Sequence, residues 1–339
     1  MFGERLILKL FRRLEPGVNP DLEVSRFLTE QSEFQHIPPF AGSLDYRRAG
    51  SPSATLGILQ GYVPNLGDAW EYTLGELKEY LSNPHRGVSL EVIGDYLQSA
   101  ALLGRRTADL HLALASDPDN PDFAPAPSTM LDQRSLFQSV RSQGMQVFEL
   151  LHARLTRLSD GARADAELVL QMQGELMARL RSVIQRPIAA TRIRTHGDYH
   201  LGQVLWTGGD FVIIDFEGEP ARPIAERRLK RWPLRDVAGM LRSFDYAANE
   251  AHRIYHDRQT LDRAARFWRD NVSQAFLREY LATAGGASFL PVTNDERQIL
   301  LETYLLEKAL YEIRYELNSR PDWVRIPLRG ILDLMGVVD

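Results

Sequence analysis

Residues 195–220 read THGDYHLGQVLWTGGDFVIIDFEGEP, and this stretch decides what the chain can be. The apolar run FVII, residues 211–214, predicts a buried strand that ends at Asp215, so a carboxylate lies at the strand tip. The preceding TGGD, residues 207–210, predicts the turn of a hairpin. This turn is expected to bring Asp198 and Asp215 to one end of the hairpin.

The two carboxylates suit phosphoryl transfer. A hydroxyl nucleophile needs one carboxylate to orient it and accept its proton, and a triphosphate needs a second hard oxygen ligand for Mg²⁺. Asp198 follows His196 and precedes Gln203 by five residues, the spacing of a kinase catalytic loop with Gln in place of the metal-binding Asn. We therefore predict Asp198 as the catalytic base, His196 as the residue that fixes its loop, and Gln203 and Asp215 as Mg²⁺ ligands.

Each of these residues also has a structural interpretation. An isolated Asp at a strand end is more often a cap or turn residue. His196 and His200 have the spacing of a zinc pair on a helix, but Gly197 and the adjoining strand pattern argue against a helix there. The order of base, amide, turn and second acid is what favours the catalytic interpretation.

A lysine stands inside the first predicted strand. Residues 5–11 predict this strand, with Lys9 within it. Asn19 is expected to cap a helix whose first residue is Pro20. Glu23 is then the expected partner of Lys9, in the ion pair that holds a kinase lysine against nucleotide phosphates. The alternative is that Glu23 only complements the helix dipole.

A second apolar strand is predicted for residues 54–62, followed by the breaker sequence PNLG. This arrangement is similar to the hinge between kinase lobes, where backbone groups bind the adenine edge. Gln60, Gly61, Tyr62 and Val63 are therefore predicted nucleotide contacts by position, and the alternative is a plain turn.

The rest of the chain is predominantly helical, so the fold class is predicted as α+β. Helices are predicted for residues 68–81, 89–115, 133–158, 162–184, 234–249, 262–283 and 295–318. The proline-rich segment 117–129 predicts an exposed loop. Asp236, at the start of one helix, either braces the catalytic loop or is an ordinary acid at a helix N-terminus.

Longer stretches resemble the bacterial maltokinases, which are aminoglycoside-phosphotransferase-like small-molecule kinases of the protein-kinase-like superfamily. The matching stretches are residues 6–30, 58–74, 196–206, 214–220, 232–247 and 315–331. The resemblance implies transfer of the ATP γ-phosphate to the anomeric hydroxyl of maltose, giving maltose 1-phosphate for α-glucan synthesis. It implies ATP and Mg²⁺ as cofactors and trehalose synthase as a possible fused or separate partner.

The helix that ends in YELNSRPDW carries aromatic and acidic side chains. Flat rings stack on sugar C–H faces, and carboxylates accept sugar hydroxyls, although an aromatic stripe at helical spacing is more often core. In maltokinases the similar segment lines the sugar pocket, which implies substrate contacts from Tyr315, Glu316, Arg320 and Trp323.

The resemblance implies a partial N-lobe over residues 1–63 and a helical C-lobe over residues 64–339, with the catalytic hairpin at 195–220 and a sugar segment at 304–323. Kinases of this class carry a cap and a glycine-rich loop before the strand lysine, and only eight residues precede Lys9. A late start assignment, a truncation, or the tail of a fused polypeptide would each explain this. The strand edge beside Lys9 is expected to be exposed.

Composition excludes several other classes of protein. A net charge of −5 offers no general attraction to nucleic acid or anionic membranes, although residues 222–235 include a basic run that is usually a solvated face. Cysteine is absent, which excludes disulfides and thiolate chemistry and is compatible with the predicted cytoplasmic location. The short apolar patch at the start predicts a strand and no membrane span.

Two alternatives to maltokinase remain open. One is a phosphotransferase for an aminoglycoside or a different sugar. The other is a silent kinase-like module that binds sugar without turnover.

Overall fold

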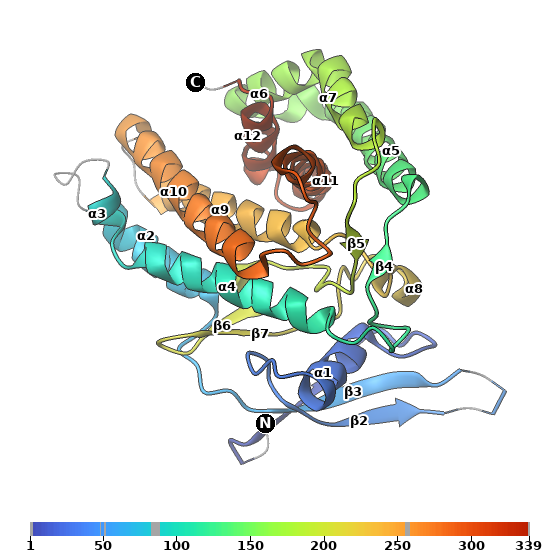
Figure 1. The fold of residues 1–339 in the computed structure, drawn as a ribbon. Coiled ribbons are helices and arrows are strands. Elements are labelled where there is room, and N and C mark those ends of the chain that lie inside the picture. The colour runs from blue at the N-terminus through green and yellow to red at the C-terminus, as the bar shows by residue number, and fades with distance from the viewer. Residues whose placement is uncertain (1–2, 48, 51, 83–88, 255–257, 338–339) are drawn as a thin grey trace. The chain divides into compact units, whose positions relative to one another are not determined.

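The computed structural model describes residues 3–47, 49–50, 52–82, 89–254 and 258–337. The fold is α+β, as predicted, with small sheets and many helices (Figure 1). The chain forms two compact units. The first comprises Met1–Ala126 and Arg192–Ala287, and the second comprises Pro127–Thr191 and Ser288–Asp339. The division into kinase lobes at residue 63 is a different partition and stays a prediction.

The first unit contains an antiparallel sheet in the order β1-β3-β2, which comprises β1 (Leu6–Leu10), β2 (Phe40–Tyr46) and β3 (Ala54–Gly61). Helix α1 (Pro20–Gln31) contacts this sheet, and the Asn19 side chain caps it as predicted by accepting from the N–H of Asp21. Among the described residues β1 pairs only with β3, so it is an edge strand of this sheet, and Leu10 on it is 62% exposed.

The remaining elements of the first unit are mostly helical. They are α2 (Ala69–Leu81), α3 (Leu90–Ile93), α4 (Tyr96–Leu114), η4 (Leu201–Gln203), β6 (Val204–Trp206), β7 (Phe211–Ile213), α8 (Ile224–Arg227), α9 (Leu234–Ile254) and α10 (Arg258–Ala284). The prediction of one helix over residues 89–115 is wrong. Gly94 follows α3 with φ of 62°, which a continuing α-helix does not allow, so the chain breaks there before α4.

Helices α4 and α10 lie side by side (Figure 1), and Gly104 sits at their closest approach. A methyl group at Gly104 would collide with the carbonyl oxygen of Phe276 on α10. We expect Gly104→Ala to lower the free energy of unfolding by roughly 1–3 kcal/mol because the two backbones must separate.

Gly75 provides the matched control, since it lies within α2 and a methyl group there meets no atom within 4 Å. Gly75→Ala is expected to raise stability by about 0.5–1 kcal/mol through helix propensity. Urea unfolding of both variants gives the comparison. Equal effects of the two substitutions would contradict the close packing of α4 on α10.

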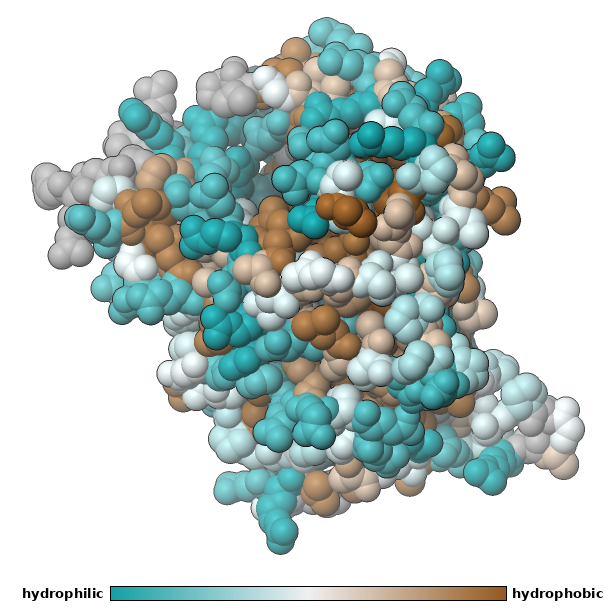
Figure 2. Space-filling view, viewed as in Figure 1, coloured by the Kyte–Doolittle hydropathy of each residue, from teal (hydrophilic) through white to brown (hydrophobic). Residues whose placement is uncertain are grey.

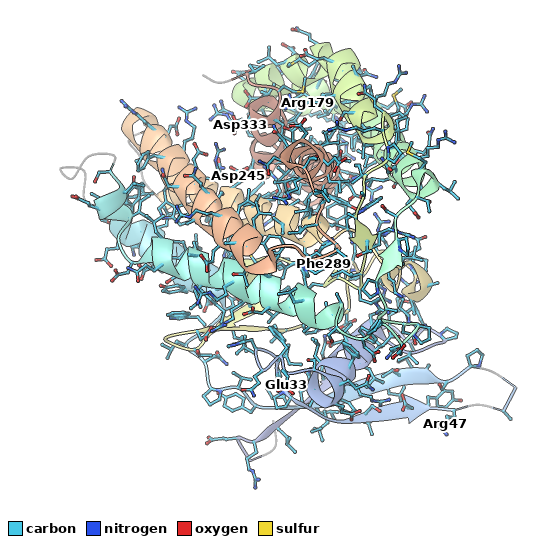
Figure 3. The ribbon with its side chains drawn as sticks, viewed as in Figure 1. Glu33, Arg47, Arg179, Asp245, Phe289 and Asp333 are labelled. Carbon is cyan, nitrogen blue, oxygen red and sulfur yellow. The ribbon has the colours of Figure 1, made fainter. Side chains whose placement is uncertain are left out.

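The second unit is helical. It comprises α5 (Met130–Arg154), η2 (Leu155–Arg157), α6 (Asp160–Gln171), α7 (Gln173–Leu180), η3 (Arg181–Ile184), α11 (Asn294–Ser319), η5 (Pro321–Trp323) and α12 (Arg325–Leu334). Arg179 on α7, labelled in Figure 3, makes a bidentate ion pair with Glu302 on α11. The two-residue strands β4 (Ala126–Pro127) and β5 (Thr191–Arg192) lie where the chain passes between the units.

The face in Figure 2 is largely hydrophilic, with hydrophobic side chains interspersed. Across the described residues, no helix combines the length and the apolar character that crossing a membrane requires. The predicted cytoplasmic location stays a prediction.

Candidate active site

The hairpin predicted from the central segment is present. Strand β6 pairs with β7 in antiparallel register, with Val204 opposite Ile213 and Trp206 opposite Phe211. The N–H of Thr207 donates to the carbonyl of Asp210 and closes the turn (3.0 Å). Arg106 on α4 donates to both carboxylate oxygens of Asp210, at 2.8 and 2.7 Å, and so fixes the turn to the helical layer.

A backbone hydrogen bond at the end of the hairpin brings the two predicted metal ligands, Gln203 and Asp215, near each other in the chain's fold. The N–H of Ile214 donates to the carbonyl of Gln203 (3.0 Å), so Gln203 lies beside the residue that precedes Asp215. Asp215 itself has φ of +67°, a left-handed backbone that costs a non-glycine residue roughly 1–2 kcal/mol. Such strain persists where surrounding contacts impose it, and it occurs most often at functional sites.

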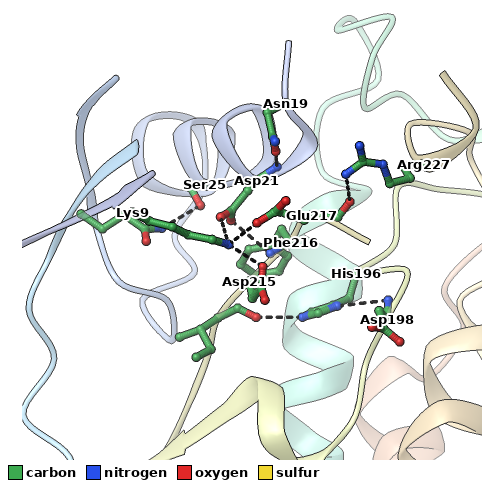
Figure 4. Close-up of polar contacts among 12 residues, drawn as sticks. Lys9, Asn19, Asp21, Ser25, His196, Asp198, Asp215, Phe216, Glu217 and Arg227 are labelled. Atoms are coloured by element: carbon green, nitrogen blue, oxygen red, sulfur yellow. Dashed lines mark hydrogen bonds and ion pairs between the residues drawn. The ribbon is translucent and has the colours of Figure 1, made fainter. Parts of the chain in front are cut away.

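His196 connects the loop of Asp198 to this strained backbone (Figure 4). Its Nε2 donates to the carbonyl of Ile214 (2.9 Å), and its Nδ1 accepts from the N–H of Asp198 (3.4 Å). These two bonds require the neutral tautomer with its proton on Nε2. The imidazole is 1% exposed, so it acts here as a buried link between the two loops. The predicted roles of His196 and Asp198 in catalysis stay predictions.

Asp236, in the first turn of α9, braces the loop of Asp198. Its carboxylate accepts the N–H groups of His196 (2.7 Å) and Gly197 (3.0 Å). His111 on α4 donates to it through Nε2 (3.2 Å), and Nδ1 of His111 lies 3.0 Å from the hydroxyl of Tyr280. Of the two interpretations of Asp236, the structure shows the bracing one.

The environment of Asp236 sets its charge. Burial alone would raise the pKa of the Asp236 carboxyl, but the hydrogen bond and charge of His111 and the N–H of Gly197 outweigh burial and hold the pKa below its usual range. Asp236 therefore stays ionised at neutral pH although it is 2% exposed. A fixed buried carboxylate of this kind orients the loop that carries Asp198.

Lys9 lies among three carboxylates (Figure 4). Its Nζ is 2.9 Å from Oδ2 of Asp21, 2.5 Å from Oδ1 of Asp215 and 2.7 Å from Oε1 of Glu217. Burial alone would lower the pKa of Lys9, but the charges of Asp21 and Asp215 outweigh it and hold the pKa above its ordinary value. The lysine is thus a charged group beside the predicted metal ligand Asp215.

The predicted ion pair between Lys9 and Glu23 is wrong. Glu23 instead forms ion pairs with Arg194 (2.7 Å) and Arg228 (3.0 and 2.5 Å). The ion pair of Lys9 with α1 is made by Asp21. Two residues along an α-helix correspond to a rotation of about 200°, so Asp21 and Glu23 point to opposite sides of α1. Any contact of Glu23 with the nucleotide stays a prediction.

Of the predicted hinge residues, Gln60 and Gly61 end β3, and Tyr62 and Val63 follow it. Gln60 donates through its side chain to Ser25 on α1 (3.1 Å). The N–H groups of Gly61 and Tyr62 already donate to the carbonyls of Pro39 and Arg5, at 2.8 Å each. Among the contacts of the described residues, the N–H of Val63 donates no hydrogen bond. If this segment binds adenine, Val63 is therefore the backbone donor we expect to serve it.

The predicted sugar segment lies in the second unit, on α11 and η5. Arg320 makes a bidentate ion pair with Glu316 (3.0 and 2.7 Å), and its guanidinium lies over the rings of Tyr315 (5.6 Å) and Trp323 (4.4 Å). The structure therefore brings these four residues into one cluster, in which Tyr315 is 47% exposed. Their contact with substrate stays a prediction.

Four members of the basic run bond to other parts of the first unit. Arg222 pairs with Glu219, Arg227 with Glu15, and Arg235 donates to the carbonyl of Gly197. Lys230 donates to the carbonyls of Pro121 and Ala124. These contacts lie within the protein, and the Arg227 side chain is only 6% exposed, so this part of the run is not the solvated face that the pattern favours.

Three functional candidates escaped sequence reasoning: Asp21, Glu217 and Arg194. The sequence places Asp21 in the first turn of its helix without indicating a site role, and Glu217 follows the predicted metal ligand Asp215 by two residues without a motif of its own. No local signal indicated that the buried Arg194, 2% exposed, would bind α1 through Glu23.

The oxygen-rich donor set fits Mg²⁺. Oxygens of Asp21, Asp215 and Glu217 lie within 4.8 Å of one another, and the backbone of Gln203 is bonded to Ile214, the residue before Asp215. Carboxylate and amide oxygens are the hard ligands that Mg²⁺ prefers. Together with the strand lysine and the loop of Asp198, this arrangement is typical of a protein-kinase-like phosphotransferase.

Sequence comparison agrees with this class. The chain belongs to the phosphotransferase enzyme family, whose model matches residues 4–268. It is 24% identical over 336 residues to the glucosamine kinase of Streptacidiphilus jiangxiensis and 27% identical over 340 residues to that of Mycolicibacterium smegmatis. Each match covers 98% of this chain, and they cover 70% and 76% of those relatives, respectively.

Solved structures show the same fold. A glucosamine kinase in complex with glucosamine, ADP and inorganic phosphate aligns with a TM-score of 0.78 at 22% identity, over 99% of this chain and 73% of that one. A choline kinase from Cryptosporidium parvum aligns with a TM-score of 0.52 at 9% identity, over 98% of this chain and 81% of that one. The protein-kinase-like fold is therefore confirmed, whereas maltokinase activity and a trehalose synthase partner stay predictions.

Proposed function

We propose that this protein is an ATP- and Mg²⁺-dependent sugar kinase, with glucosamine and maltose as the two substrates to be compared first. The observation that carries the proposal is the junction of the two loops at Ile214, where His196 binds the carbonyl and Gln203 accepts the N–H. This junction links the loop of Asp198 to the residue before Asp215, which supports a shared site for the two carboxylates. Family membership and the ADP complex of a glucosamine kinase support the same reaction.

The roles follow from the chemistry of each group. Asp198 would orient the sugar hydroxyl and accept its proton as the bond to phosphorus forms. Asp215 and Gln203 would hold Mg²⁺, which when bound neutralises charge on the transferring phosphate. Lys9 would pair with the nucleotide phosphates, and the buried His196 and Asp236 would keep Asp198 in place. Positioning and charge neutralisation then supply most of the rate enhancement.

The identity of the sugar is the finer question. Relatives at 24% and 27% identity carry the name glucosamine kinase, which favours an amino sugar, while YELNSRPDW favours maltose through its resemblance to maltokinases. The rings of Tyr315 and Trp323 and the carboxylate of Glu316 suit a sugar in either case. We propose these residues, with Arg320, as sugar contacts.

A substrate panel tests the function. The protein is incubated with Mg²⁺-ATP and glucosamine, maltose, glucose or an aminoglycoside, and products are identified by phosphorus NMR. A phosphorylated glucosamine would support an amino-sugar kinase, and maltose 1-phosphate would support a maltokinase. If no compound in the panel is phosphorylated while the protein is folded and binds a sugar, the sugar-kinase proposal fails in favour of a silent binding module.

A further inference from the structure

The ammonium of Lys9 occupies the space between three carboxylates that could hold a metal ion. Its Nζ lies 2.5–2.9 Å from one oxygen of each of Asp21, Asp215 and Glu217. Those residues offer ligand oxygens within 4.8 Å of one another. Figure 4 shows the lysine reaching from β1 toward this acidic trio, which we define as Asp21, Asp215 and Glu217.

An ammonium and a divalent cation cannot share this position. Mg²⁺ binds oxygen at about 2.0–2.1 Å, so an ion held by two members of the acidic trio would lie within a few ångströms of Nζ. Two like charges so close in a partly buried site repel strongly. Binding of the metal to Asp215 and Glu217 therefore requires Lys9 to leave.

The three carboxylates differ in their solvent exposure and in how firmly hydrogen bonds hold them. Asp21 is 1% exposed, and its Oδ1 accepts the N–H of Phe216 (3.0 Å) while Oδ2 binds Lys9. The side chains of Asp215 and Glu217 are 33% and 26% exposed, and that of Lys9 is 30% exposed. Asp21 is thus a fixed anchor between α1 and the Asp215 segment, whereas the lysine and the other two carboxylates border solvent.

We propose that Lys9 is an internal counterion of the acidic trio, so that it and a divalent cation exclude each other until nucleotide phosphates draw the lysine away. This inference rests on the proposed function, since it needs a nucleotide that competes for Lys9. Nucleotide would then bind before, or together with, its metal ion. The affinity of the nucleotide-free protein for a divalent cation would be low, because the ammonium of Lys9 already neutralises Asp215 and Glu217.

Mn²⁺ binding to nucleotide-free protein tests the proposal without any turnover. The concentration of free Mn²⁺ is measured by electron paramagnetic resonance in titrations of three proteins. These are wild type, Lys9→Met, and the double variant Lys9→Met with Glu217→Gln. We expect Lys9→Met to bind Mn²⁺ about tenfold or more tightly than wild type, because a positive charge is removed beside three carboxylates. The added Glu217→Gln change should return the affinity toward the wild-type value.

Lys78→Met is the matched control, since it removes a lysine charge from the exposed face of α2 and should leave Mn²⁺ binding unchanged. Thermal unfolding supplies a second readout and checks that each variant is folded. Mg²⁺ should raise the Tm of Lys9→Met, and of Lys9→Gln made alongside it, but not that of wild type. Equal Mn²⁺ affinity in wild type and both Lys9 variants would overturn the proposal, whatever the substrate panel shows.

Discussion

Replacing Asp198 by Asn is expected to lower kcat by about 10³-fold, because general-base catalysis contributes roughly 10²–10⁴-fold and the amide cannot accept the hydroxyl proton. The N–H of Asp198 and its contact with His196 are backbone features that the substitution retains. Affinity for nucleotide should therefore change little. Initial rates with the best substrate of the panel, beside calorimetric titration of ATP, measure the two quantities separately.

Asp119→Asn is the control for this substitution, since Asp119 lies exposed in the loop that follows α4. It removes the same charge and should leave kcat unchanged. A rate for Asp198→Asn within a factor of about three of wild type would show that a different group accepts the proton, because general-base effects are far larger. Loss of ATP binding in the variant would instead indicate a change of structure.

Local patterns made the centre of the site predictable. The hairpin could be predicted from the TGGD turn and the apolar run before Asp215, because the register of a hairpin depends on a few adjacent residues. The Asn19 cap was predictable for the same reason, since its side chain bonds a backbone group two residues away. Family resemblance gave the kinase-like fold, which composition and periodicity alone leave undetermined.

Contacts between distant residues were not predictable. Asp21 and Phe216 are 195 positions apart, and no local pattern records their hydrogen bond. Whether Asp21 or Glu23 pairs with Lys9 depends on which side of α1 faces the lysine. The sequence alone does not determine this orientation of the helix. Strand β2 was missed because its sequence, FAGSLDY, lacks clean alternation and pairs with register shifts.

Asp236→Asn is expected to lower the free energy of unfolding by roughly 2–4 kcal/mol and to reduce kcat as well. The amide has one acceptor oxygen where the carboxylate has two, so it cannot satisfy His111 and the N–H groups of both His196 and Gly197. A buried donor left without an acceptor costs about 1–3 kcal/mol, and more where a charge is lost. Urea unfolding at pH 7 measures the loss of stability.

Asp245→Asn is the matched control, because Asp245 (Figure 3) is also a buried acid on α9 and pairs with Arg242 and Arg269 away from the catalytic loop. Both variants should lose stability, but only Asp236→Asn should lose kcat at temperatures where both remain folded. Loss of kcat in both would indicate that α9 as a whole, and not its bond to the loop, supports catalysis.

The stability of wild type and of Asp236→Asn should also depend differently on pH. Its pKa is depressed in the folded protein, so its contribution is fully present above the unfolded value of about 3.9 and is lost as the pH falls through the lower folded pKa. Wild type should therefore lose this contribution below pH 4, whereas Asp236→Asn should show a shallower acid decline. Parallel acid curves for the two proteins would mean that the carboxylate is not held ionised by His111 and the loop.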